Sequence, residues 1–237
     1  MRTFLLLVAT SFFMVAPASA NVVAPGAFEF VDAPDANCIP LTGCLDTDRY
    51  QQVYSASEFL GPIEISGIAF RLDATAGNIS ALPLSFTLSN VSLGLSTTSG
   101  GPDGLSATFA DNRGADFTVV RSGSVTLASA YLGGLPVAPL DVLIEFDTHF
   151  AYDPSAGNLL FDWQNFGGET LAPVQFFDMV NSSGDSTSRV RAFDVNATTG
   201  SLQTRGLVTM FVAAPEPSSF ALLILGVVGL GWAHRRL

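Results

Sequence analysis

The chain of 237 residues has only two cysteines, and their spacing is the first feature with chemical consequences. Five residues separate Cys38 from Cys44. A disulfide between them would close a short loop and stabilise the fold by about 2–3 kcal/mol, if the chain is exported to an oxidising compartment. The alternative is half of a metal site, but no further His or Cys ligand lies nearby in the sequence. We therefore predict a disulfide between Cys38 and Cys44.

One histidine, His149, lies in the central part of the chain and is the residue to consider for acid–base chemistry. A Ser-His-Asp triad is formally possible, but the sequence lacks the Gly-x-Ser-x-Gly turn that often carries such a serine. Glu145 and Asp147 share one face of a strand, where they could reach the separation of a glycosidase pair. Exposed strand acids often have this spacing. We predict no catalytic residue and expect His149 to face solvent.

Two acidic loops and a set of aromatic residues could bind ligands. Asp32 with Asp35, and Asp46 with Asp48, could offer oxygen ligands to Ca²⁺, but the EF-hand spacing is absent, so we predict solvated loops and no metal. Flat aromatic rings with a polar group could form a sugar-binding platform. The candidates are Tyr50, Tyr54, Tyr131, Tyr152 and Trp163, of which the last is better placed for packing in a core.

The composition restricts which elements can position these residues. Hydrophobic residues make up 48% of the chain and charged residues 13%, with 19 Phe and 22 Gly, which favours a β-rich extracellular protein over a helical bundle. All ten basic residues are arginines, against 21 acids, and the net charge is −11. This charge excludes the basic surface of a nucleic-acid-binding protein, so no nucleic-acid partner is expected. No cofactor is predicted either.

Short alternating segments predict an all-β fold, a single β-sandwich or jelly-roll-like domain over residues 21–212. The clearest alternation lies at 142–150, where every second residue is apolar for most of the run. Residues 117–127 predict a hairpin that turns at 122–124, and residues 202–212 predict the last strand. Turn residues are frequent, and no long helical periodicity appears outside the two ends of the chain.

Residues 1–20 have the three parts of a secretory signal peptide. Arg2 is the basic start, residues 4–15 are apolar, and Ala18 and Ala20 are the small residues that signal peptidase accepts before its cleavage site. The alternative is an N-terminal membrane anchor, but the apolar run is shorter than the ~20 residues that span a bilayer. We predict cleavage after Ala20.

The C-terminal segment, residues 213–237, has a different set of three parts. Two prolines flank an acid in Pro215-Glu216-Pro217, and they keep this stretch extended and accessible to a protease. A membrane-spanning helix is predicted at about 218–233, followed by a basic tail, 234–237, that stays cytoplasmic. A plain tail anchor is the alternative. The apolar helix includes Phe220, Leu222, Leu223, Ile224, Leu225, Val227, Val228, Leu230 and Trp232, and the basic stop is Arg235 and Arg236.

This order of Pro-Glu-Pro, apolar helix and arginine cluster resembles the PEP-CTERM sorting signal of Gram-negative bacteria, a tail that also ends some ice-binding proteins. The resemblance implies processing by an exosortase, a membrane-embedded cysteine transpeptidase that cuts near the motif. It implies a precursor that is anchored in the inner membrane and is then moved to the outer surface or the extracellular matrix. Residues 49–54, 68–71, 152–154 and 157–160 further resemble secreted bacterial sandwiches with such tails, which implies a fold and no activity.

Signal peptidase and an exosortase are therefore the expected partners during export, with exopolysaccharide as a candidate partner afterwards. We expect a non-enzymatic protein of the cell surface or of a biofilm matrix. A carbohydrate-binding module or an adhesin of the same matrix is the alternative. A secreted hydrolase is less favoured, because it would need a cleft with paired carboxylates of shifted pKa.

Overall fold

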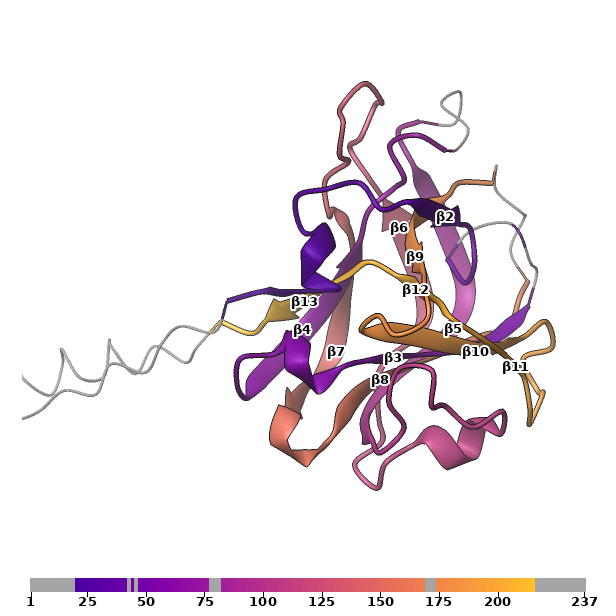
Figure 1. The fold of residues 1–237 in the computed structure, drawn as a ribbon. Helices are drawn as coiled ribbons and strands as arrows, with labels where there is room; N and C mark the ends of the chain where they lie inside the picture. The colour runs from indigo at the N-terminus through magenta and orange to yellow at the C-terminus, as the bar shows by residue number, and fades with distance from the viewer. Residues whose placement is uncertain (1–19, 42–43, 45–46, 77–81, 169–173, 216–237) are drawn as a thin grey trace, which may run out of the picture. The chain divides into compact units, whose positions relative to one another are not determined.

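In the part of the chain that the structure describes, strands are joined by loops and single 3-10 turns, which confirms the predicted all-β fold. These residues belong to one unit of the chain, Ala20–Pro215. The 3-10 turns are η1 (Gly26–Phe28), η2 (Ala56–Glu58), η4 (Phe109–Asn112) and η5 (Pro154–Ala156). The computed structural model describes residues 20–41, 44, 47–76, 82–168 and 174–215 (Figure 1).

The described strands form three antiparallel sheets. One has four strands, in the order β1 (Val22–Ala24), β13 (Thr209–Ala213), β4 (Ile63–Phe70) and β7 (Val142–Tyr152). A second has six, in the order β11 (Ser201–Gln203), β10 (Thr187–Ala192), β3 (Asp48–Tyr54), β8 (Asn158–Asn165), β5 (Ser85–Thr98) and β6 (Thr118–Ala128). The smallest has three, in the order β12 (Arg205–Leu207), β9 (Phe177–Asn181) and β2 (Asp35–Asn37).

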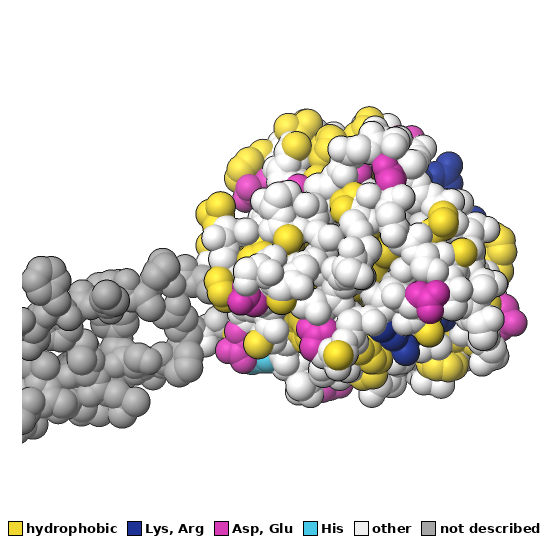
Figure 2. Space-filling model, turned by 60° about the horizontal axis from the view of Figure 1, so that its bottom comes forward, with side chains coloured by type: hydrophobic (Ala, Val, Ile, Leu, Met, Phe, Trp, Pro, Cys, Tyr) yellow, Lys and Arg dark blue, Asp and Glu magenta, His cyan; other side chains and the backbone are white. Residues whose placement is uncertain are grey.

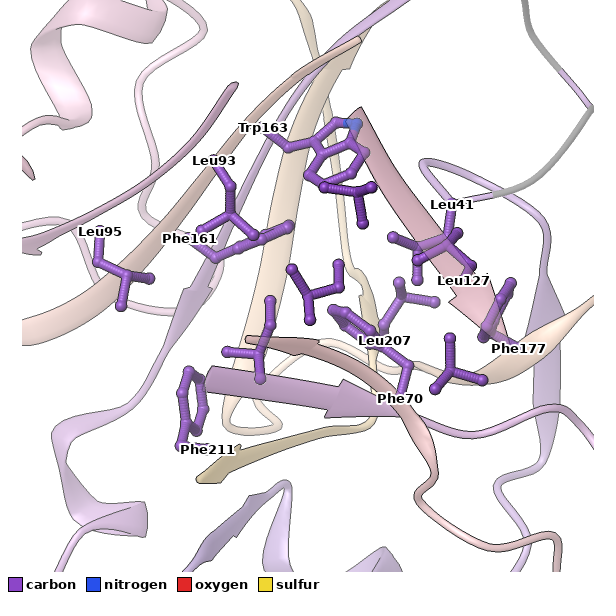
Figure 3. Packing of buried hydrophobic residues seen from close by; sticks show 14 of the residues in the cluster. Leu41, Phe70, Leu93, Leu95, Leu127, Phe161, Trp163, Phe177, Leu207 and Phe211 are labelled. Atoms are coloured by element: carbon purple, nitrogen blue, oxygen red, sulfur yellow. The ribbon is translucent and has the colours of Figure 1, made fainter. Parts of the chain in front are cut away.

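The four-stranded and six-stranded sheets face each other across an aromatic core, so the fold is a β-sandwich. Tyr54 on β3 meets Phe211 on β13 edge to face, with ring centroids 4.9 Å apart. Phe70 on β4 meets Phe161 on β8 in the same way at 6.2 Å. Figure 3 shows side chains from both sheets converging on this core. Each of these rings is fully buried, and such pairs add about 0.5–1.5 kcal/mol to the burial of their area.

The outer face of the six-stranded sheet is also covered, which the alternating pattern did not predict. Every residue of β3 is buried, and so are most of β8. Phe109 on η4 and Leu105 before it pack on Val53, Leu160 and Val190 of the sheet. The loop between β5 and β6 therefore acts as a third layer over the middle of the sandwich.

The predicted hairpin at 117–127 is wrong, because this segment is one continuous strand, β6. It pairs with β5, with Leu88 opposite Val125 and Val91 opposite Gly123. The two residues of β5 between these pairs face a single residue of β6, so the pair contains a β-bulge. Gly123 has a φ of 88°, a conformation that glycine adopts without strain. The small residues at 122–124 thus shape a bulge and do not reverse the chain.

The predicted last strand, 202–212, is also corrected. The structure divides it into β11, β12 and β13, which lie in three different sheets. Leu202 pairs with Val190 in the six-stranded sheet, whereas Phe211 pairs with Val22 in the four-stranded sheet. Between them, Gly206 lies so close to Thr187 that a Cβ atom there would fall 2.3 Å from the threonine methyl group. This segment joins the three sheets through short pairings.

Candidate functional site

The two ends of the described domain lie next to each other on the four-stranded sheet. β1, the first strand, pairs with β13, the last, with Val22 opposite Phe211. Beyond this pairing, the backbone N–H of Ala213 donates to Oδ1 of Asn21 at 3.0 Å. The predicted signal cleavage site, after Ala20, and the start of the predicted sorting segment, at Ala213, are therefore brought together. Ala20 itself is exposed.

The chain passes from buried to exposed within two residues after β13. The strand is internal to its sheet, with β1 on one side and β4 on the other. Ala214 is still buried, and its N–H donates to the carbonyl of Glu64 at 2.7 Å. Pro215, the first residue of the predicted Pro-Glu-Pro motif, is exposed. Pro215 is therefore the one described residue of this motif, and it lies outside the folded sheet.

Most of the predicted sorting signal lies outside the described residues, as does most of the signal peptide. This applies to Ala18, Glu216 and Pro217, to the predicted helix at about 218–233, and to Arg235 and Arg236. Among the residues that are described, no helix is long and apolar enough to cross a membrane. The membrane-spanning segment thus remains a prediction from the sequence.

Comparison with known proteins identifies the C-terminal segment. Residues 213–236 match the PEP-CTERM protein-sorting motif. The chain is thus an exported protein of the exosortase-sorted class, made as a membrane-anchored precursor that is processed toward the cell surface. No curated protein and no solved structure matches the chain.

The candidate catalytic residues lie on the exposed face of β7. His149 is exposed, as predicted, and its Nδ1 lies 3.3 Å from a carboxylate oxygen of Glu64 on β4. Asp147 is exposed and forms an ion pair with Arg121 on β6, with 2.5 Å between Nη1 and Oδ1. Glu145 is exposed on the same face. These acids are therefore neighbours of basic side chains on an open strand face.

The five aromatic candidates for a sugar-binding platform do not form one, because all of them are core residues. Tyr50, Tyr54 and Trp163 are completely buried, and the other two are buried as well. The Tyr54 hydroxyl is hydrogen-bonded to Thr209, 2.7 Å away, and burial raises the pKa of this tyrosine well above its usual value. Only the expectation that Trp163 packs in a core is confirmed. A sugar cannot reach these rings in the folded domain.

The cysteines and the acidic loops occupy the region before β3. Cys38 and Cys44 are joined by a disulfide. Asp35 is exposed, as expected for a solvated loop, whereas Asp46 lies outside the described residues. Asp48 departs from the prediction, because it is buried and accepts a hydrogen bond of 3.2 Å from the indole N–H of Trp163. Among the described acids of these loops, Asp35 is therefore a surface group and Asp48 a core group.

A buried ionic network under the η4 loop was missed by the sequence. Asp162 on β8 accepts hydrogen bonds from Arg49 on β3, from Gln51 and from Arg113. Burial alone would raise the pKa of Asp162, but the bonds from the two arginines outweigh it and lower the pKa. Residues on neighbouring strands make this network, so only knowledge of the strand pairing could have predicted it. Its burial and full pairing indicate a structural role.

A second acidic group lies at the three-stranded sheet, with Asp73 and Asp178 buried and Asp32 half-buried. Asp32 comes close to Asp73, which follows β4, and to Asp178 on β9. Asp178 also forms an ion pair with Arg71. Burial raises the pKa of Asp178 to about 7, because lost hydration outweighs the attraction of Arg71, and the charge of Asp32 adds to this effect. The sequence offered Asp32 as a partner of Asp35, since the approach of β4 and β9 is not visible in it.

Proposed function

We propose that this protein is a non-enzymatic component of the outer surface or the exopolysaccharide matrix of a Gram-negative bacterium. Signal peptidase removes residues 1–20, and an exosortase processes the C-terminal signal. The observation that carries this proposal is the PEP-CTERM motif at 213–236, which begins where the last strand leaves the folded sheet. The exposure of Pro215 supports direct access by the processing enzyme.

The surface of the domain supports a role in contacts with solvent and matrix. Figure 2 shows one face on which acidic side chains are spread among polar and apolar ones. The chain as a whole carries a net charge of −11. A net charge of this size favours solubility and cation-mediated contacts with other acidic polymers. Three residues were considered for catalysis: His149, Glu145 and Asp147. All three are exposed on β7 and contribute to the polar surface of the domain.

Carbohydrate binding and adhesion are weaker candidates than a structural surface role. The five aromatic residues that could have stacked on sugars are buried, so a binding module would need other residues. A secreted hydrolase is weaker still, because Asp147 is exposed and paired with Arg121. The structural surface role needs neither a platform nor a cleft.

The test is the substitution Glu216→Gln in the full chain, expressed in a bacterium that makes the processing enzyme. Glu216 is the one acidic or basic residue between Arg205 and His234, so the variant removes the only formal charge of this stretch and keeps the side-chain shape. We expect the wild type to leave the membrane fraction and the variant to accumulate there as a precursor that retains its C-terminal tail. Intact mass and cell fractionation report both.

Glu145→Gln is the matched control, since it removes an exposed acid from the folded domain. It should be processed and located like the wild type. Normal processing of the Glu216→Gln variant would contradict the sorting role of the motif. Release of reducing sugar ends from matrix polysaccharide by the processed wild type, absent in the Glu145→Gln variant, would contradict the non-enzymatic role.

A further inference from the structure

Three carboxylates from distant parts of the chain converge beside β9. Asp32 lies in the loop before β2, Asp73 follows β4, and Asp178 is on β9. One carboxylate oxygen of each lies within 4.8 Å of one from the other two. The backbone fixes this arrangement, because the N–H of Asp73 donates to the carbonyl of Phe176 at 2.9 Å and the N–H of Asp178 to that of Arg71 at 3.2 Å.

One basic side chain, Arg71, faces this group of acids. It is 1% exposed, and its Nε donates to Oδ2 of Asp178. Its Nη atoms donate to the backbone carbonyls of Phe28, Glu29 and Val31, so they hold the loop before β2. One positive charge stands against three carboxylates, which leaves a formal charge of −2 when all three are ionised. Buried charges of one sign are costly unless a counter-charge is bound.

Asp178 also has an oxygen that the protein leaves without a partner. The residue is 0% exposed. Its Oδ2 accepts hydrogen bonds from Arg71 and from the N–H of Ala33, at 3.2 Å in the second case. Its Oδ1 is buried and has no hydrogen-bond partner among the described residues. Buried carboxylate oxygens are almost always paired, so this atom is free to take a further partner, and a bound cation would supply one.

We propose that Asp32, Asp73 and Asp178 bind one calcium ion. All ligand atoms in the group are carboxylate oxygens, which suit hard cations. The group contains none of the His or Cys ligands that favour zinc or copper. Calcium–oxygen distances of about 2.3–2.6 Å let ligands on opposite sides of the ion lie about 5 Å apart, whereas magnesium requires a tighter octahedron. A divalent ion would neutralise the formal charge of −2.

The carboxylates are already oriented for such an ion. Oδ1 of Asp73 accepts hydrogen bonds from the N–H and the hydroxyl of Thr75, at 2.8 and 2.9 Å. Oδ1 of Asp32 accepts from the N–H of Ala74 at 3.2 Å. These bonds hold each carboxylate and leave its other lone pairs for a ligand. The ion would join the loop before β2 and the end of β4 to β9.

The experiment measures thermal unfolding of the purified full chain in detergent, at pH 7.5, after removal of divalent ions with EGTA. We expect 10 mM Ca²⁺ to raise the unfolding midpoint by about 3–8 °C, given the millimolar or tighter affinity of extracellular calcium sites. Isothermal titration calorimetry with CaCl₂ should give one site per chain. The same concentration of Mg²⁺ should give a smaller shift, and an equal shift would overturn the choice of calcium.

The variant Asp32→Asn tests the ligands without loss of the fold, because the Asn Oδ1 can still accept the bond from Ala74. In EGTA its unfolding midpoint should equal or exceed that of the wild type, since one of three like charges is gone. Its Ca²⁺-dependent shift should disappear. Asp35→Asn, an exposed acid three residues away, should keep the full shift. The proposal is overturned if the wild type shows no shift, or if both variants respond to calcium alike.

Discussion

Asp162 shows how single buried charges are held in this domain. It is 2% exposed and lies between Arg49, which is buried, and Arg113, whose side chain is 30% exposed. Two donors from Arg49 reach its two oxygens, in the bidentate geometry that makes arginine–carboxylate pairs strong. Breaking a buried ion pair leaves an uncompensated charge in a region with little water.

The substitution Asp162→Asn should therefore destabilise the domain by about 3–5 kcal/mol, because Arg49 would stay buried without its counter-charge. Urea unfolding followed by circular dichroism measures this free energy. Asp147→Asn is the control. It removes an exposed partner of Arg121 and should change stability by less than about 1 kcal/mol. Equal losses in both variants would contradict the assignment of Asp162 as a buried structural charge.

The same residue predicts how stability depends on pH. Because the ion pairs lower the pKa of Asp162, the fold stabilises the ionised form. That contribution is present above the ordinary aspartate pKa of about 3.9 and is lost as the pH falls through the lower value in the folded state. The stability difference between the wild type and Asp162→Asn should thus shrink between pH 6 and pH 2. A difference that stays constant over this range would rule out the predicted linkage.

At the scale of elements, the loop closed by Cys38 and Cys44 precedes β3, a strand in the middle of the six-stranded sheet. A loop this short constrains the unfolded chain, and its disulfide should contribute about 2–3 kcal/mol. The double variant Cys38→Ser/Cys44→Ser should lose that amount in urea unfolding. Added reductant should cost the wild type about as much and leave the variant unaffected. An intact mass that shows two free thiols in the oxidised wild type would refute the bond.

Elements with one covered face were predictable from the sequence, and elements with two covered faces were not. In β7 buried and exposed residues alternate over most of the strand, as the spacing of its apolar residues predicts. In β3, polar residues outnumber apolar ones, yet Arg49 and Gln51 are buried like Tyr50 because Phe109 on η4 lies over them. Local pattern reports which residues share a face, but it cannot report what a distant loop places over that face.

The candidate sites divide in the same way. The sorting motif is contiguous in sequence, so Pro215, Glu216 and Pro217 could be identified without a structure. The carboxylates of Asp32, Asp73 and Asp178 come from three segments, and only the pairing of β9 with β2 and the bridge from Leu72 to Phe177 bring them together. A search for nearby acids in the sequence instead favoured Asp35, which is exposed.

At the scale of the whole domain, the last strand limits where the chain can be cut. β13 is hydrogen-bonded along both edges, and Ala214 is still buried. A protease needs an extended, accessible backbone, so it cannot cut within Thr209–Ala213 unless the four-stranded sheet opens. We expect the mature C-terminus at residue 215 or later. Mass spectrometry of the processed protein determines it, and an end within β13 would contradict this limit.

The pairing of β1 with β13 has a mechanical consequence. Tension between the two ends of the chain would act on neighbouring strands at the same end of their ladder, and it would peel them apart one hydrogen-bond pair at a time. A load that pulls β13 toward its C-terminus against the opposite end of the sheet would instead shear its ladders with β1 and β4. Asp141, which precedes β7, lies at that opposite end, because Val142 faces Phe70 and Phe70 faces Thr209. Single-molecule pulling should therefore give a lower rupture force between residues 20 and 215 than between residues 141 and 215.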